Sequence, residues 1–244
     1  MGTVIHQVRC VAFDFGGTLA SPGPEPGGDL IAEVLSTVTG REVPPQLAAA
    51  FDVAYLEVTQ ADRETASHSP FAHTLAMAAR RVGFALTPGE AAEAAEAVFV
   101  TLPDATPDAD ACRAVQVVQE AGLRCVLACD TQRSEPVRRA TLAAAGIEDR
   151  FSALVLSGVL GVRKPHPRFY DAVLQAADCE PGHVLFVGDT YRKDVAGPIR
   201  AGMRAVLVAR PGRGLPIRTD PGASAFAVVG HVRELPALLG VAQP

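Results

Sequence analysis

Cys10-Val11-Ala12-Phe13-Asp14-Phe15-Gly16-Gly17-Thr18-Leu19 is an apolar run that ends in a carboxylate and then in two glycines. The residues from Val8 to Phe13 are too few for a typical helix and are apolar on both faces, a pattern that predicts a central strand of a parallel sheet. Asp14 therefore stands where this strand ends. Ligands of open α/β sheets bind at the carboxyl ends of strands, so Asp14 is a candidate functional residue. The alternative is an aspartate that merely shapes a turn before glycine.

Composition and charge limit the class of protein. The chain has 244 residues, 48% of them hydrophobic, which is enough to bury a full core, and its formal net charge is -5. This negative balance argues against nucleic acid and anionic membranes as partners. The basic pair Arg138-Arg139 is typical of a solvated helix face.

The apolar runs and the cysteines point to the cytoplasm. No apolar run approaches the ~20 residues that cross a bilayer, and the N-terminus lacks a charged segment followed by an apolar signal core. The five cysteines are odd in number and form no Cys-x-x-Cys pair. We therefore expect a soluble cytoplasmic protein with reduced thiols, either a monomer or a homodimer.

Two breaks rich in proline separate regions of different pattern. They lie at residues 21–28 and 103–108. Between them, apolar residues recur at helical spacing, with Asp29 as a candidate N-cap and a capping-box spacing at Thr87-Pro88-Gly89-Glu90. We expect an all-helical cap domain at residues 20–103, inserted into a core domain that comprises residues 1–19 and 104–244.

Helix and strand patterns alternate after the second break. Such repeated units predict right-handed parallel crossovers, and hence an α/β fold with a doubly wound, Rossmann-like parallel sheet. Beyond the first strand, we expect strands near residues 124–128, 153–156, 184–187, 205–208 and 225–229.

Polar residues follow three of the expected strands. They are Asp14, the pair Cys129-Asp130 and the pair Gly188-Asp189. In a parallel sheet these three strand ends lie at one edge, and Lys164 in the turn at residues 161–165 adds an ammonium. Carboxylates supply the oxygen ligands that Mg²⁺ requires, and a lysine offsets the charge of a phosphoryl group.

Together these segments resemble the haloacid dehalogenase superfamily, in the branch with a helical cap inserted after the first motif. The stretch Asp14–Leu19 is similar to the nucleophile motif, Lys164-Pro165 to the lysine motif, and Gly188-Asp189-Thr190 through Asp194 to the acidic metal motif. The resemblance covers nearly the whole chain. It implies a phosphohydrolase that acts on a small phosphorylated metabolite.

The resemblance also implies roles for individual residues. Asp14 would be the nucleophile that attacks phosphorus and forms an aspartyl-phosphate, which water then hydrolyses. Lys164 would offset charge between Asp14 and the phosphoryl oxygens. The phosphate-binding residues implied in this way are Cys129, Asp130, Thr131 and Lys164.

The implied cofactor is Mg²⁺. Its ligands would be Asp14, the backbone carbonyl of Gly16, and Asp189. Asp194 would support the metal shell, or orient water or Lys193.

Two positions depart from the family pattern. Phosphatases of this family have a second aspartate two residues after the nucleophile, which protonates the leaving oxygen, whereas this chain has Gly16. General acid-base catalysis contributes about 10²- to 10⁴-fold, so hydrolysis of an ordinary ester should be slow. The second departure is Cys129, where the family usually has Ser or Thr. A thiol donates only weakly, although Thr131 or a backbone N–H could compensate.

These departures leave several functions open. The first is a Mg²⁺-dependent phosphatase with a substituted acid, or one for a substrate with a good leaving group such as an acyl phosphate. The second is a disabled member that only binds or regulates. A dehalogenase is less favoured, because it would need no acidic metal motif. His68 and His73 in the cap could replace the missing acid, but we favour a position on a helix surface or in cap packing for both.

Overall fold

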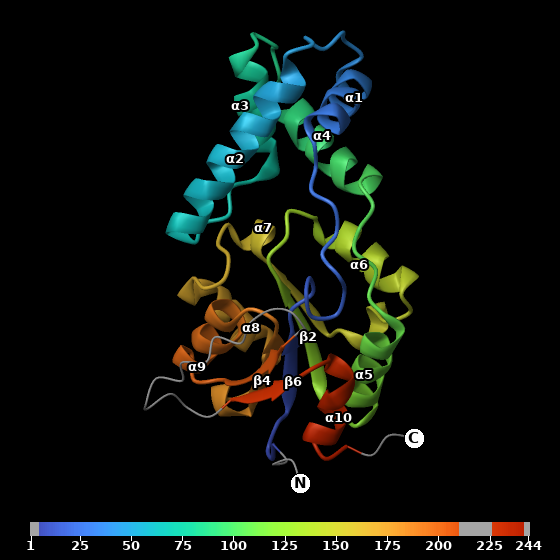
Figure 1. Ribbon diagram of the computed structural model, residues 1–244, viewed down its shortest axis with the longest axis vertical. Coiled ribbons are helices and arrows are strands. Elements are labelled where there is room, and N and C mark those ends of the chain that lie inside the picture. Colours follow the sequence, from blue (N-terminus) through green and yellow to red (C-terminus); the bar gives the residue numbers. More distant parts are fainter. Residues whose placement is uncertain (1–4, 210–225, 242–244) are drawn as a thin grey trace.

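The computed structural model describes residues 5–209 and 226–241, in which six strands form one parallel sheet (Figure 1). The strand order is β3-β2-β1-β4-β5-β6. The strands are β1 (Cys10–Phe13), β2 (Arg124–Cys129), β3 (Ala153–Leu156), β4 (Val184–Gly188), β5 (Arg204–Val208) and β6 (Ala227–Val229). The predicted doubly wound α/β fold is confirmed. Residue 225, where the last strand was expected to begin, lies outside the described residues.

Helices cover both faces of this sheet because successive strand residues point to opposite sides. Val11 and Phe13 of β1 pack in one buried cluster with side chains of α5, α6 and α10, whereas Cys10 and Ala12 pack in another with side chains of α8. These helices are α5 (Ala109–Glu120), α6 (Glu135–Ala144), α8 (Pro167–Ala177) and α10 (Leu235–Leu238), and two short helices are α7 (Ser157–Leu160) and α9 (Gly197–Arg200). β1 is thus buried on both faces, as its sequence predicts.

Four helices between β1 and α5 form a helical segment with a buried cluster of its own, which includes Ile31, Phe51 and Leu75. They are α1 (Gly28–Thr39), α2 (Leu47–Thr65), α3 (Phe71–Arg81) and α4 (Pro88–Thr101). Figure 1 shows this segment beyond the carboxyl edge of the sheet. No helix in the described part of the chain is long and apolar enough to cross a membrane.

The helix ends show one success and one error of prediction. The capping box at Thr87 is present, because Thr87 Oγ1 accepts from the N–H of Glu90 while the Glu90 carboxylate accepts from the N–H of Thr87. Asp29 was wrong as an N-cap. Gly27 is the N-cap of α1, and Asp29 lies in the first turn, where its charge still complements the helix dipole.

The prediction of a solvated helix face was wrong for Arg138, because this residue is buried. Its guanidinium pairs with Asp104 Oδ2 at 2.8 Å and lies 3.9 Å from the centre of the Phe15 ring. Arg133 pairs with Oδ1 of the same aspartate at 3.1 Å, and its Nη2 donates to the carbonyl of Leu102. Both arginines therefore bind the segment that connects α4 to α5 and hold it in place.

Candidate active site

Asp14 follows the central strand β1 and is held from two sides. Its Oδ1 accepts a hydrogen bond from Nζ of Lys164 at 2.8 Å, and its Oδ2 accepts one from Oγ1 of Thr18 at 3.0 Å. Its backbone N–H donates to the carbonyl of Val187 in β4 at 2.9 Å. The sheet and these partners fix the carboxylate. Thr18 lies within the first motif, but its role in orienting Asp14 was not predicted.

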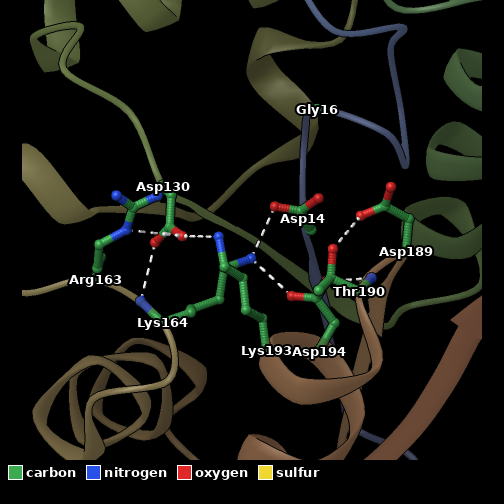
Figure 2. A pocket seen from close by; sticks show the side chains of 9 residues that line it. All are labelled: Asp14, Gly16, Asp130, Arg163, Lys164, Asp189, Thr190, Lys193 and Asp194. Carbon is green, nitrogen blue, oxygen red and sulfur yellow. Dashed lines mark hydrogen bonds and ion pairs between the residues drawn. The ribbon is translucent and has the colours of Figure 1, made fainter. Parts of the chain in front are cut away.

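Lys164 is buried among oxygen acceptors. Its Nζ donates to Oδ1 of Asp14 and to Oδ1 of Asp194, both at 2.8 Å (Figure 2). It also donates to the carbonyl of Ala128 at 3.2 Å. Burial alone would lower the pKa of this lysine, but the carboxylates of Asp14, Asp194 and Asp130 hold the pKa well above its usual value. Lys164 therefore keeps its positive charge beside the Asp14 carboxylate.

Three carboxylates meet at this edge of the sheet. Asp14, Asp189 and Asp194 each offer an oxygen, and these oxygens lie within 4.8 Å of one another. The three residues line a cavity of about 200 Å³, together with Gly16. Burial raises the pKa of Asp194 to about 6, and the nearby Lys164 ammonium opposes that rise. Such a set of hard oxygen donors fits Mg²⁺.

A tight backbone turn positions Asp194. This residue lies in a π-helical turn, Tyr191–Ala196, and its Oδ2 accepts from the N–H of Thr190 at 2.9 Å. A Cβ on Gly188 would lie 2.3 Å from Cγ of Asp194, so the close approach of strand and carboxylate requires glycine. π-helical turns are rare and frequent at functional sites, which agrees with the position of this one.

A second charged group lines the same cavity, on the side away from Asp189 in Figure 2. Asp130, which follows β2, accepts from Nζ of Lys193 at 2.8 Å and from the backbone N–H of Lys164 at 2.9 Å. Nε of Arg163 lies 3.6 Å from Oδ2 of Asp130. Burial raises the pKa of Asp130, but the lysines and Arg163 outweigh it and lower that pKa. Asp130 therefore stays ionised.

Comparison with known proteins identifies the family of the chain. Residues 8–202 match the family of haloacid dehalogenase-like hydrolases. The chain belongs to this family. The superfamily predicted from the sequence motifs is thereby confirmed, and so is the prediction of a hydrolase.

Individual relatives include phosphatases and dehalogenases. A phosphoserine phosphatase of Thermus thermophilus is 38% identical over 109 residues, which cover 45% of this chain and 42% of that protein. An L-2-haloacid dehalogenase of Xanthobacter autotrophicus with chloropropionic acid covalently bound has a TM-score of 0.57 at 22% identity, covering 96% of this chain and 98% of the other. The putative HAD-hydrolase YfnB of Bacillus subtilis bound to magnesium has a TM-score of 0.60 at 14% identity, and the match covers 96% of this chain and 100% of the other.

These likenesses differ in what they show. The chain covers less than half of the length of the matched phosphoserine phosphatase. Both solved structures are too distant in sequence to show more than a shared fold. The activity and substrate of this family member are therefore proposals, which rest on its own site.

Two residues implied to bind phosphate do not line the cavity. Cys129 is 2% exposed, and its thiol packs in the hydrophobic cluster beside Phe13 and Leu156, where burial raises its pKa to about 12. Thr131 Oγ1 accepts from Nη2 of Arg138 at 3.2 Å. The Thr131 backbone N–H is also engaged, because it donates to Ser157 Oγ at 2.8 Å. Of the implied phosphate-binding set, Asp130 and Lys164 reach the cavity.

The two histidines of the helical segment lie away from the cavity lining. His73 is exposed on α3. His68 is buried between the helical segment and the sheet, with its Nδ1 2.6 Å from Ser157 Oγ. Burial and Arg163 lower the pKa of His68 to about 4, so its ring is neutral near pH 7. The structure thus places His68 in packing, as favoured from the sequence.

This histidine predicts a pH dependence of stability. The pKa of His68 is about 4 in the folded protein and near 6.5 when unfolded, so the unfolded state binds more protons in between. The contribution of His68 to the free energy of unfolding is therefore constant above pH ~6.5. It falls by about 3 kcal/mol as the pH drops from ~6.5 to ~4. His68→Asn keeps a polar group near Ser157 without titrating. Urea unfolding at several pH values should show a flatter profile for this variant, and an unchanged profile would contradict the assignment.

Proposed function

We propose that the chain is a Mg²⁺-dependent phosphohydrolase that acts on a small phosphorylated metabolite in the cytoplasm. The observation that carries this proposal is the position of Lys164 Nζ, 2.8 Å from both Asp14 and Asp194, in a cavity that Asp189 also lines. A nucleophilic carboxylate, a fixed cation and further oxygen ligands are the groups that phosphoryl transfer needs.

In the proposed reaction, a carboxylate oxygen of Asp14 attacks phosphorus and the bond to the leaving oxygen breaks. Water then hydrolyses the aspartyl-phosphate and regenerates Asp14. Lys164 offsets the negative charge of the phosphoryl oxygens and of Asp14 throughout both steps. Thr18 keeps the attacking carboxylate oriented.

We further propose that Mg²⁺ is held by Asp14, Asp189 and the backbone carbonyl of Gly16, with Asp194 in support. When bound, the ion would neutralise charge on the phosphoryl group. We also propose that the helical segment is a cap domain, because it stands beyond the edge that carries the site (Figure 1). The proposed domain division is residues 1–19 and 104–244 for the core, and 20–103 for the cap.

Gly16 favours a second candidate function. No carboxyl group stands two residues after Asp14, so the chain lacks an acid at the position from which phosphatases of this family protonate the leaving oxygen. A protein that keeps the metal and phosphate site without turnover would also have this feature. Binding without hydrolysis is therefore the competing proposal.

Phosphate release separates these two functions. We expect Mg²⁺-dependent release that is fastest from acetyl phosphate, slower from 4-nitrophenyl phosphate and slowest from alkyl phosphates, because leaving groups of lower pKa need less protonation. Chelation of Mg²⁺ should lower the rate by at least about 100-fold. If no substrate on a broad panel releases phosphate in a Mg²⁺-dependent way, the binding function is the correct one.

Metal binding is measured independently by thermal unfolding. Mg²⁺ at 100 times its Kd should stabilise the folded protein by about 2.7 kcal/mol. Asp189→Asn should remove most of this stabilisation, whereas Asp149→Asn, whose side chain is 73% exposed in the wild type, should retain it. Equal responses of both variants would contradict the proposed ligand set.

A further inference from the structure

Arg163 and Lys193 form a cationic pair around Asp130, which we call the Asp130 clamp. All three residues line the cavity, and the Arg163 and Lys193 side chains are 16% and 32% exposed. Lys164 is different, because its Nζ is fully engaged by Asp14, Asp194 and a carbonyl. The clamp is thus a separate set of charges in the same cavity.

The clamp carries more positive charge than Asp130 neutralises. One carboxylate faces two cations, so one positive charge remains on this side of the cavity. Asp130 already accepts hydrogen bonds from Lys193 Nζ and from the backbone N–H of Lys164. The Asp130 carboxylate therefore has hydrogen-bond donors without Arg163.

The guanidinium of Arg163 has donors to spare. Its ion pair with Asp130 is 3.6 Å long, beyond the usual hydrogen-bond length, and within the described residues the guanidinium makes no hydrogen bond. The backbone of Arg163 is nevertheless fixed, since its N–H donates to the carbonyl of Ala66 in the helical segment at 3.0 Å. An arginine whose backbone is held in place, and whose guanidinium N–H groups face a cavity, is suited to bind a carboxylate.

We propose that Arg163 and Lys193 bind a carboxylate on the leaving group, so that the substrates are phosphate monoesters bearing a carboxylate. This inference rests on the proposed function, in which Asp14 and Lys164 take the phosphoryl end. The single excess charge of the clamp matches a monoanion better than a second phosphate. The fork of guanidinium donors supplies the paired hydrogen bonds that a carboxylate accepts.

Binding of phosphonates tests this inference without turnover. The probes are phosphonoacetate, 3-phosphonopropionate and 4-phosphonobutyrate, each paired with the alkylphosphonate in which methyl replaces the carboxylate. Isothermal titration calorimetry with Mg²⁺ present should show at least one carboxylate binding about 10- to 100-fold more tightly than its alkyl partner. Arg163→Gln and Lys193→Gln should each reduce this ratio toward one.

Arg168→Gln is the matched control, because Arg168 is an exposed arginine at the start of α8 that does not line the cavity. It should keep the wild-type ratio. A wild-type ratio below about 3-fold at every chain length, no binding of any probe, or an undiminished ratio in Arg163→Gln would overturn the inference. Tighter binding of a bisphosphonate of equal length would overturn the choice of carboxylate.

The two proposals fail in different ways. Loss of the carboxylate preference, with Mg²⁺-dependent phosphate release intact, would remove the clamp inference alone. A carboxylate preference without any phosphate release would support the clamp and remove the hydrolase.

Discussion

Asp14→Asn should lower the rate of phosphate release by at least about 1,000-fold, because an amide cannot attack phosphorus. Asparagine has nearly the shape of aspartate, so Lys164 can still donate to its carbonyl oxygen and Thr18 can accept from its amide. The fold should therefore survive the change. Phosphate release and thermal unfolding are measured on the same preparation, so that lost activity is not mistaken for lost structure.

Asp171→Asn is the control for this substitution. Asp171 is exposed on α8 and does not line the cavity, so the variant should keep the wild-type rate. Mass spectrometry after rapid quenching of an acetyl phosphate reaction should find a phosphoryl group on the peptide that contains Asp14, and none in Asp14→Asn. Persistent activity of Asp14→Asn would refute the nucleophile assignment.

The meeting of the acidic residues could be predicted from the sequence because parallel pairing is regular. Phe13 is in register with Leu127 of β2 and with Val187 of β4, so the residues that follow these strands leave the sheet at one edge. This geometry brings Asp14, Asp130 and Asp189 to one cavity. The roles assigned to them remain predictions, since position alone does not establish chemistry.

The residues that sequence reasoning missed depend on distant partners. Arg138 is buried because Asp104, far along the chain, meets its guanidinium, and no local pattern contains that contact. The position of Cys129, which the sequence did name, has a local cause instead, because a strand turns alternate side chains to opposite faces and Cys129 faces the hydrophobic cluster. Arg163 likewise lies beside Asp130, a residue far from it in the sequence.

Gly16→Asp should raise the hydrolysis of simple aryl phosphates, by about 10-fold or more for phenyl phosphate, because general acid catalysis contributes about 10²- to 10⁴-fold. The position has room for the side chain. A Cβ added at Gly16 meets no atom within 4 Å, and the backbone is not in the left-handed region. Gly17 is unlike it, since a Cβ there would lie 2.2 Å from Oδ2 of Asp189 at a φ of +91°.

The gain should depend on the leaving group and on the pH. It should be largest for phenyl phosphate, smaller for 4-nitrophenyl phosphate and smallest for acetyl phosphate, because a poorer leaving group needs the proton more. The new carboxyl acts in its protonated form, and nearby carboxylates favour that form, so the gain should increase toward lower pH. Steady-state rates on the three substrates across pH test both trends.

Gly16→Asn is the decisive control, because it adds nearly the same atoms without an ionisable proton. If only Gly16→Asp gains activity, the missing acid limits the wild-type enzyme. Equal gains in both variants would assign the effect to shape instead. Unchanged or lower rates in Gly16→Asp, with Mg²⁺ binding intact, would mean that the site lacks more than an acid, and would favour the function of binding without turnover.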